Sequence, residues 1–174
     1  FWEDRNPLHH VKDVKPAIMV VGGLFDAEDC YGAWETYKTF AHQSPSTNTT
    51  LVMGPWFHGA WGGRGSGEQF GPVRFNSKTS EWYQNEFEIP FFKKYLEDNP
   101  TPTVGDKVNM FITGSNQWAS FGQWPPKDVQ EINLFLAENN SLKYKKSDNQ
   151  GAFDQYTSDP NHPVPYRPDI SWNR

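Results

Sequence analysis

The stretch that most constrains the fold runs from residue 17 to residue 61, where strand and helix patterns alternate. Residues 17–21 form a short apolar run between Pro16 and a Gly-Gly pair, which is typical of a buried strand. A second short apolar run covers residues 51–53. Between the two runs, apolar residues recur at helical spacing: Cys30, Ala33, Trp34, Tyr37, Phe40 and Ala41. The order strand, helix, strand predicts a parallel strand pair and an α/β fold.

Each predicted strand ends in a turn that carries polar residues. Asp26, Glu28 and Asp29 follow the first strand, and Gly-Pro-Trp-Phe-His-Gly, which includes His58, follows the second. Both turns are expected at the carboxyl edge of the sheet, where ligands bind in open α/β folds. A carboxylate there can hold an imidazole in one tautomer and stabilise its protonated form. Asp26 and His58 are therefore candidates for two members of a Ser-His-Asp triad.

The nucleophile of such a triad is not visible in the sequence. The chain order acid, then base, is that of the α/β-hydrolases, whose serine comes earlier still in a G-x-S-x-G motif. No such motif occurs, and Ser66, within Gly-Ser-Gly, follows no strand pattern and precedes no plausible helix. We therefore reject Ser66. Either the serine lies upstream of Phe1, in a longer protein of which this chain is expected to be a piece, or the triad interpretation is wrong. By itself the chain is expected to be inactive.

The two turn motifs resemble those of the α-amino acid ester hydrolases, which belong with the cocaine esterases, glutaryl acylases and X-prolyl dipeptidyl peptidases. The resemblance rests on Asp-Ala-Glu-Asp at residues 26–29 and on the Gly-Pro-Trp-Phe-His-Gly turn, and it extends to Asp-Pro-Asn-His-Pro-Val-Pro at residues 159–165. It implies that Asp26 is the triad acid and His58 the base. It also implies that Glu28 and Asp29 belong to a carboxylate cluster that binds the α-ammonium group of the substrate.

The charges of the first turn favour the same assignment on physical grounds. Two adjacent carboxylates at the start of a helix create a negative field that attracts an ammonium ion. The alternative is that Glu28 and Asp29 only complement the helix dipole, at about 0.3–1 kcal/mol each, and that Asp26 only caps the helix. A calcium site formed by these three acids has little support, because the interleaved ligands of a loop site are missing.

No metal, cofactor, nucleic acid or membrane is indicated as a partner. His9 and His10 are adjacent and point apart on any regular element, so they do not favour a metal site. The net charge of −5 and the scattered Lys and Arg lack the basic footprint of a nucleic-acid binder. Gly-rich residues 62–67 match no phosphate-binding motif. Cys30 is the only cysteine and is expected to be a small buried hydrophobe rather than half of an internal disulfide.

The second half of the chain changes character after a proline-rich stretch. Residues 79–99 show helical periodicity that Pro90 is expected to break or kink, which gives two helical pieces. After residues 99–106, which have linker composition, residues 108–113 and 131–137 are predicted to be strands of an antiparallel sandwich. Trp118 and Trp124 are expected in its core rather than against a sugar ring. His162, among prolines, is expected to be a turn residue.

The sequence thus predicts an α/β fold in two parts: residues 1–102 as the C-terminal part of an α/β-hydrolase domain, and residues 103–174 as the start of a β jelly roll. A jelly roll needs about eight strands, so an incomplete one favours pairing with another chain, and we expect a homo-oligomer. The resemblance implies a serine hydrolase acting on small-molecule esters or amides with an α-amino group, such as β-lactam side chains. The alternatives are a dipeptidyl peptidase or neutral-ester hydrolase of the same superfamily, or a β-sandwich binding module without catalysis. The resemblance further suggests a bacterial, periplasmic or secreted protein.

Overall fold

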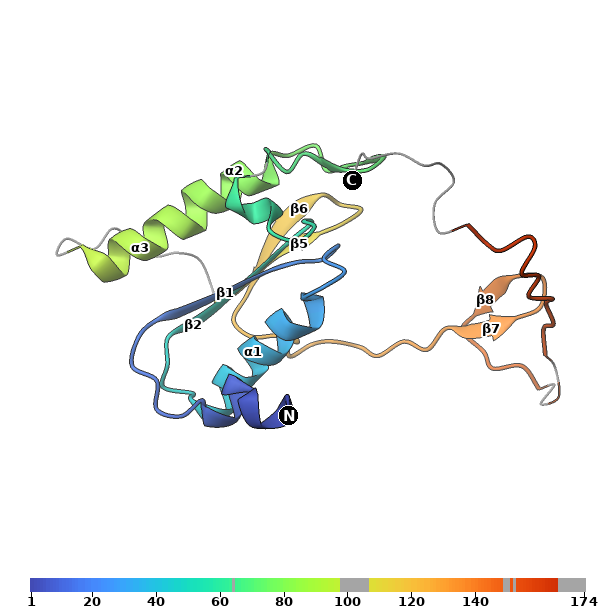
Figure 1. Cartoon of the computed structure of the whole chain (residues 1–174), viewed down its shortest axis with the longest axis horizontal. Coiled ribbons are helices and arrows are strands. Elements are labelled where there is room, and N and C mark those ends of the chain that lie inside the picture. Colours follow the sequence, from blue (N-terminus) through green and yellow to red (C-terminus); the bar gives the residue numbers. More distant parts are fainter. Residues whose placement is uncertain (64, 98–106, 149–150, 152, 166–174) are drawn as a thin grey trace. The chain divides into compact units, whose positions relative to one another are not determined.

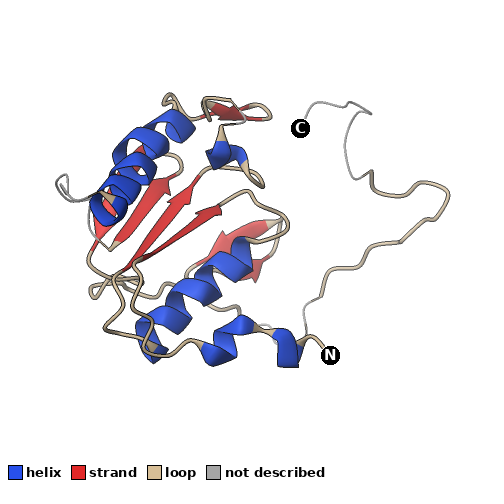
Figure 2. Cartoon of the chain, turned by 60° about the vertical axis from the view of Figure 1, so that its left-hand side comes forward, coloured by secondary structure: helices blue, strands red, loops and turns tan. Residues whose placement is uncertain are grey.

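The computed structural model describes residues 1–63, 65–97, 107–148, 151 and 153–165. Contacts divide the chain into a first compact unit, Phe1–Lys127, and a second that begins at Asp128. The first unit is built around a sheet with helices on its faces (Figure 1, Figure 2). In the described part of the chain no helix is long and apolar enough to cross a membrane.

The sheet of the first unit has four strands in the order β1-β2-β5-β6. The strands are β1 (Ile18–Gly23), β2 (Thr49–Gly54), β5 (Val108–Ile112) and β6 (Gln117–Phe121). β1, β2 and β5 run parallel, and β6 pairs with β5 antiparallel. All six residues of β2 are buried, as expected for a parallel strand with both faces covered. The predicted α/β class and the predicted parallel pair are confirmed.

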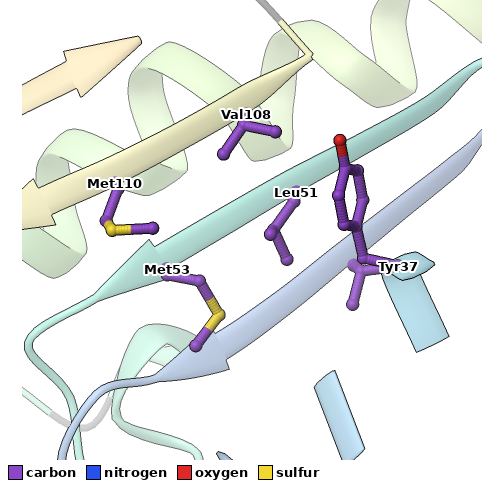
Figure 3. Packing of buried hydrophobic residues seen from close by; sticks show 6 residues of the cluster. Tyr37, Leu51, Met53, Val108 and Met110 are labelled. Atoms are coloured by element: carbon purple, nitrogen blue, oxygen red, sulfur yellow. The ribbon is translucent and has the colours of Figure 1, made fainter. Parts of the chain in front are cut away.

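Helix α1 (Cys30–Gln43) packs on one face of this sheet. Residues that alternate along the strands point to this face, and Tyr37 of α1 closes the cluster over Leu51, Met53, Val108 and Met110 (Figure 3). Cys30 is a free cysteine that packs against this cluster as predicted, although it is only partly buried. The apolar face predicted from the sequence is therefore the face that α1 packs on the sheet, except that Ala41 is exposed.

The other face is covered by a single helical run made of α2 (Thr79–Tyr83), the π-helical turn η4 (Gln84–Glu88) and α3 (Ile89–Leu96). The two helical pieces predicted around Pro90 are present as α2 and α3, but a π-helical turn joins them and Pro90 does not end the run. The backbone amide of Ile89 bonds to the carbonyl of Gln84, five residues back, and Pro90 stands in the first turn of α3, where a missing N–H costs little. The π turn lets the helix continue past the proline.

The strand predicted at residues 108–113 exists, but its assignment to a separate sandwich is wrong. It is β5, and its pairing with β2 places it inside the α/β sheet. The predicted boundary between residues 102 and 103 lies outside the described residues, and by contacts the first unit extends to Lys127. Trp118 and Trp124 are packed in this unit, Trp118 stacked on Trp82 with ring centroids 4.4 Å apart and Trp124 against Trp34 at 5.7 Å.

The remaining elements are short. They are η1 (Glu3–Arg5), η2 (Pro7–His10), η3 (Ala60–Gly62) and the hairpin of β3 (Gln69–Phe70) and β4 (Val73–Arg74). The second unit contains the hairpin of β7 (Phe135–Ala137) and β8 (Ser141–Lys143). The jelly roll predicted for this part of the chain stays a prediction.

Candidate active site

The ends of β1 and β2 are joined by backbone hydrogen bonds that continue beyond the sheet. The amide of Leu24 donates to the carbonyl of Gly54 over 2.8 Å, and the amide of Phe25 donates to the carbonyl of Trp56 over 3.1 Å. Gly23 permits this approach, because a Cβ at that position would lie 2.2 Å from the Trp56 carbonyl oxygen. The two turns therefore leave the sheet side by side.

Trp56 anchors the second turn from within the core. Its side chain is 1% exposed, and its indole nitrogen donates to the hydroxyl of Thr79 over 2.9 Å. Its ring meets Tyr83 edge-on with centroids 5.4 Å apart. Because Trp56 lies two residues before His58, this anchoring fixes where the turn presents the imidazole.

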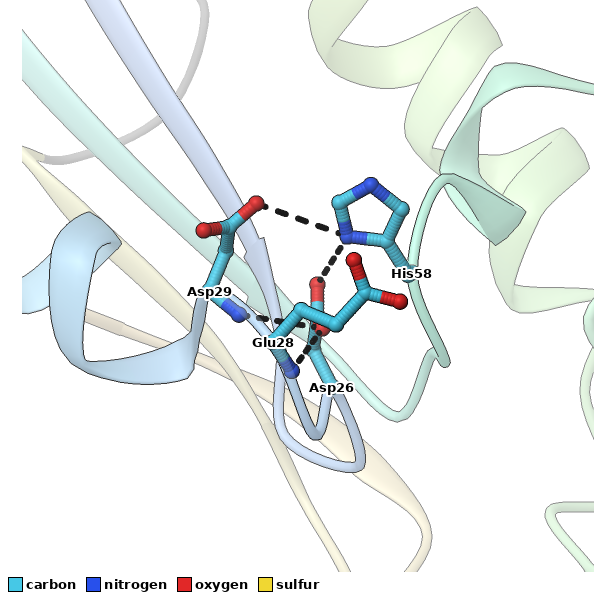
Figure 4. A network of polar contacts seen from close by, with 4 residues as sticks. All are labelled: Asp26, Glu28, Asp29 and His58. Carbon is cyan, nitrogen blue, oxygen red and sulfur yellow. Dashed lines mark hydrogen bonds and ion pairs between the residues drawn. The ribbon is translucent and has the colours of Figure 1, made fainter.

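Asp26 stands at the end of the first turn with its carboxylate almost fully buried. Its Oδ1 accepts hydrogen bonds from the backbone amides of Glu28 and Asp29 at 2.8 and 3.1 Å, and its Oδ2 lies 3.1 Å from Nδ1 of His58 (Figure 4). Burial alone would raise the pKa of Asp26, but these two amides, together with the hydrogen bond and charge of His58, hold it below the ordinary value of a carboxyl. Asp26 is therefore ionised at neutral pH and points at the imidazole.

His58 is held at one side of its ring and open at the other. Nδ1 lies between Asp26 and Asp29, whose Oδ2 is 3.5 Å away, while Nε2 points away from both carboxylates (Figure 4). The side chain is 48% exposed, and Trp61 meets its ring edge-on at 6.3 Å. An imidazole whose Nδ1 donates to a buried carboxylate offers Nε2 as a base. The predicted juxtaposition of Asp26 and His58 is thus present in the structure.

The chain is similar to known hydrolases along nearly its whole length. The family model for X-Pro dipeptidyl-peptidase (S15 family) matches residues 1–60, which include both turns. A cocaine esterase from Rhodococcus sp. (strain MB1 Bresler) is 25% identical over 94% of this chain and 29% of its own length. The crystal structure of an aminopeptidase from a marine sediment archaeon, Thaumarchaeota archaeon, is 34% identical with a TM-score of 0.81, over 92% of this chain and 26% of that one. A structure of α-amino acid ester hydrolase is 28% identical with a TM-score of 0.79, over 91% and 26%.

The family model, the cocaine esterase and the α-amino acid ester hydrolase structure all support a similarity to this family of hydrolases. The chain spans between a quarter and a third of the length of the relatives that it matches. The resemblance drawn from the two turn motifs is confirmed at the level of this family, and the α/β fold is shared with its solved structures.

Glu28 and Asp29 are exposed beside His58. Helix α1 begins directly after Asp29, but the Asp29 side chain makes no capping hydrogen bond to it; only its backbone carbonyl accepts from Ala33. Helix capping therefore accounts for the hydrogen bonds to only one oxygen of the Asp26 carboxylate. It accounts for no contact of the Asp29 side chain. Both exposed acids remain available to an ion in solvent.

Three side chains of the site have the donor types of a metal site. Among the described residues, Asp26, Asp29 and His58 form a group whose ligand atoms lie within 4.8 Å of one another. Glu28, which the calcium hypothesis included, does not belong to it, and both oxygens of Asp26 already accept hydrogen bonds. Because the oxygens of Asp26 are already engaged, this donor set suits a hydrogen-bonded aspartate-histidine pair better than a metal centre.

Ser66, rejected as a nucleophile from the sequence, lies in a loop. Its hydroxyl donates to Oε2 of Glu68 over 2.9 Å, and it lines a cavity of about 460 Å³ together with Phe57 and Arg74. It precedes no helix, so the strained strand-to-helix turn of a nucleophile elbow is absent at this position.

Sequence reasoning missed the residues that position the pair. Gly23, Phe25 and Trp56 set the spacing of the two turns through backbone contacts that no local pattern encodes. A Gly in a strand pattern does signal a close approach of another backbone, and Gly23 carried that signal.

Proposed function

We propose that this chain supplies the acid and the base of a Ser-His-Asp hydrolase that cleaves, or transfers the acyl group of, α-amino acid esters and amides. The observation that carries the proposal is the contact of 3.1 Å between the buried Asp26 carboxylate and Nδ1 of His58, with Nε2 left open. A base must lie within hydrogen-bond reach of its orienting group, and this pair does.

Each residue has one role in the proposed reaction. A serine from another part of the full-length protein attacks the ester or amide carbonyl, and His58 Nε2 takes the proton of its hydroxyl. His58 then gives that proton to the leaving group as the acyl-enzyme forms. Asp26 keeps Nδ1 protonated and stabilises the imidazolium. Water, or an amine such as a β-lactam nucleus, releases the acyl group in a second step in which His58 acts as base again.

Glu28 and Asp29 support an α-amino substrate. Asp29 is within 3.5 Å of the imidazole, so an ammonium group bound there lies next to the reacting centre. Among the relatives, an aminopeptidase and an α-amino acid ester hydrolase both carry names that denote substrates with a free α-amino group. The two carboxylates supply the negative charge that such a group requires.

Two other substrate classes have specific support within the family. The family model is named for X-Pro dipeptidyl peptidases, which would use the same carboxylates to hold a peptide amino terminus. The cocaine esterase relative represents hydrolysis of an ester other than an α-amino acid ester. A β-sandwich binding module without catalysis is disfavoured, because Asp26 and His58 lie at an α/β sheet edge in a family of hydrolases.

The test compares two matched substrates in the full-length protein. Replacing Glu28 by Gln and Asp29 by Asn together should lower kcat/KM for an α-amino ester by about tenfold or more, since a charge-assisted hydrogen bond is worth about 1.5–3 kcal/mol. The N-acetylated ester, which carries no ammonium group, should change less than twofold. A control in which Glu81 and Glu86 are both replaced by Gln removes the same charge from the helix on the other face. Equal losses on both esters would reject the ammonium site and favour a neutral-ester hydrolase.

We further propose that the second unit is the start of a jelly roll. Leu136 and Leu142 are cross-strand partners in the β7-β8 hairpin and are 87% and 57% exposed. Residues opposite each other share one face of a hairpin, so this face is apolar and suited to packing against further strands.

A further inference from the structure

One phenylalanine connects the two turns that carry the candidate acid and base. The ring of Phe70 stacks on Phe25 with centroids 5.1 Å apart and planes at 25°, and it lies 6.1 Å from the ring of Phe57 with planes at 32°. Phe25 directly precedes Asp26, and Phe57 directly precedes His58. The side chain of Phe70 therefore contacts both turns, each one residue away from a member of the pair.

The hairpin that presents Phe70 is anchored in the core. Phe75, which directly follows β4, is 1% exposed and packs edge-on against Phe111 of β5 with ring centroids 5.7 Å apart. The Phe75 amide donates to the carbonyl of Glu68 over 2.8 Å, which extends the β3-β4 ladder by one pair. Phe70 and Phe75 consequently lie on the same face of the hairpin, and both stack on Phe25.

The base of the hairpin is tied to the same framework as the His58 turn. The Thr79 hydroxyl donates to the carbonyl of Gly67 over 2.7 Å and accepts from the indole of Trp56. The amide of Ser80 donates to the carbonyl of Ser66 over 3.0 Å. One residue, Thr79, thus fixes both the start of the hairpin and the tryptophan that anchors the histidine turn.

The pair itself needs such support. The His58 side chain is 48% exposed, so burial does not fix its ring. The backbone bonds that join the turns, from Leu24 to Gly54 and from Phe25 to Trp56, do not involve the ring either. We infer that Phe70 is a positioning residue for the proposed hydrolase reaction: its ring clamps Phe25 and Phe57 together and so keeps Asp26 in hydrogen-bond contact with His58. Displacements of about 1 Å are enough to lower a rate strongly, because the reaction depends on orientation.

This inference rests on the proposed function and is tested in the full-length protein with three variants. Phe70→Ala should lower kcat for an α-amino ester about tenfold while KM changes less than twofold. Phe70→Tyr, which keeps the ring, should stay within twofold of the unchanged protein. Val73→Ala is the matched control, because Val73 is the cross-strand partner of Phe70 and is 45% exposed.

A second readout reports on the pair without turnover. The hydrogen bond to Asp26 should give the Nδ1 proton of His58 a far-downfield NMR signal, identified by its loss in His58→Gln. Phe70→Ala should broaden or remove this signal, and Val73→Ala should leave it unchanged. Full kcat in Phe70→Ala, or a lower kcat with an intact signal, would overturn the inference.

Two further outcomes keep the tests separate. If Phe70→Ala does not fold, Phe70→Leu replaces it, since leucine keeps apolar volume but not the flat ring; full kcat in that variant overturns the inference. If His58→Gln remains active, the proposed function itself fails, whereas an inactive His58→Gln with a fully active Phe70→Ala rejects the role of Phe70 alone.

Discussion

In the described part of the chain, two hydrogen-bonded aspartate-histidine pairs have nearly equal distances. Nδ1 of His58 lies 3.1 Å from Asp26, and Nδ1 of His162 lies 2.9 Å from Asp159. Both aspartates also accept a backbone amide two residues ahead, Asp26 from Glu28 and Asp159 from Asn161. By hydrogen-bond distance alone, the second pair is the better one.

Their surroundings differ completely. Asp159 and His162 are three residues apart in one turn, with side chains 43% and 85% exposed. Asp26 and His58 are 32 residues apart, and the Asp26 side chain is 1% exposed. Bringing distant residues together costs chain entropy that a local turn does not pay, so a long-range pair requires a scaffold built for it. Burial and topology, rather than distance, distinguish a candidate site from a turn.

Replacing each of the two histidines in turn gives the largest expected difference in kcat. In the full-length protein, His58→Gln should lower kcat by roughly 10³-fold or more, as for other members of catalytic triads. His162→Gln should leave kcat within twofold, because that ring serves only its own turn. Ester hydrolysis by both variants under saturating substrate measures the contrast. Comparable losses in the two variants would mean that the first pair is no more catalytic than the second.

The next effect concerns the scaffold that the long-range pair needs and the local pair does not. Gly23→Ala would place a Cβ against the Trp56 carbonyl, so the turns must separate; we expect a loss of about 2 kcal/mol or more in the free energy of unfolding. Gly32→Ala in α1 is the control, because nothing lies within 4 Å of that position and alanine favours a helix by up to about 1 kcal/mol. Urea unfolding followed by tryptophan fluorescence tests both. A Gly23→Ala protein as stable as the control would show that the close approach is dispensable.

Much of this scaffold was predictable from residues 17–61. Two short apolar runs around a helical pattern determine a parallel pair, and a parallel pair brings Asp26 and His58 to one edge. The position of β5 in the sheet was not predictable, because Val108–Ile112 is an apolar run that suits a parallel strand and a sandwich strand equally. In addition, Leu51, which pairs with Val108, is far away in the sequence. The contact of Phe70 with both turns was likewise hidden, because no periodicity relates the β3-β4 hairpin to the strand ends.

A smaller expected effect is the pH dependence of the free energy of unfolding, which should distinguish Asp26 from Asp159. The pKa of Asp26 is lowered in the folded chain, so its ionised form contributes stability that is fully present above the unfolded-state pKa, about 4. That contribution is lost as the pH falls through the folded-state pKa. Asp26→Ala should therefore be less stable than the unchanged chain at pH 7 by about 1–3 kcal/mol, because the Glu28 and Asp29 amides lose their acceptor. This difference in stability should shrink below pH 4. Urea unfolding between pH 7 and pH 2 measures it; a difference independent of pH would contradict the assigned ionised carboxylate.

The smallest expected effect comes from the exposed pair. The hydrogen bond from His162 lowers the pKa of Asp159, aided by the Asn161 amide, so the sign of its pH dependence equals that of Asp26. Water solvates this carboxylate almost as well in the unfolded chain, and exposed pairs contribute little. Asp159→Ala should therefore leave both kcat and the urea midpoint unchanged within error, at pH 7 and in acid. A midpoint shift as large as that of Asp26→Ala would show that the turn at Asp159 is structurally tied to the rest of the protein, and the contrast between a local pair and a scaffolded one would no longer hold.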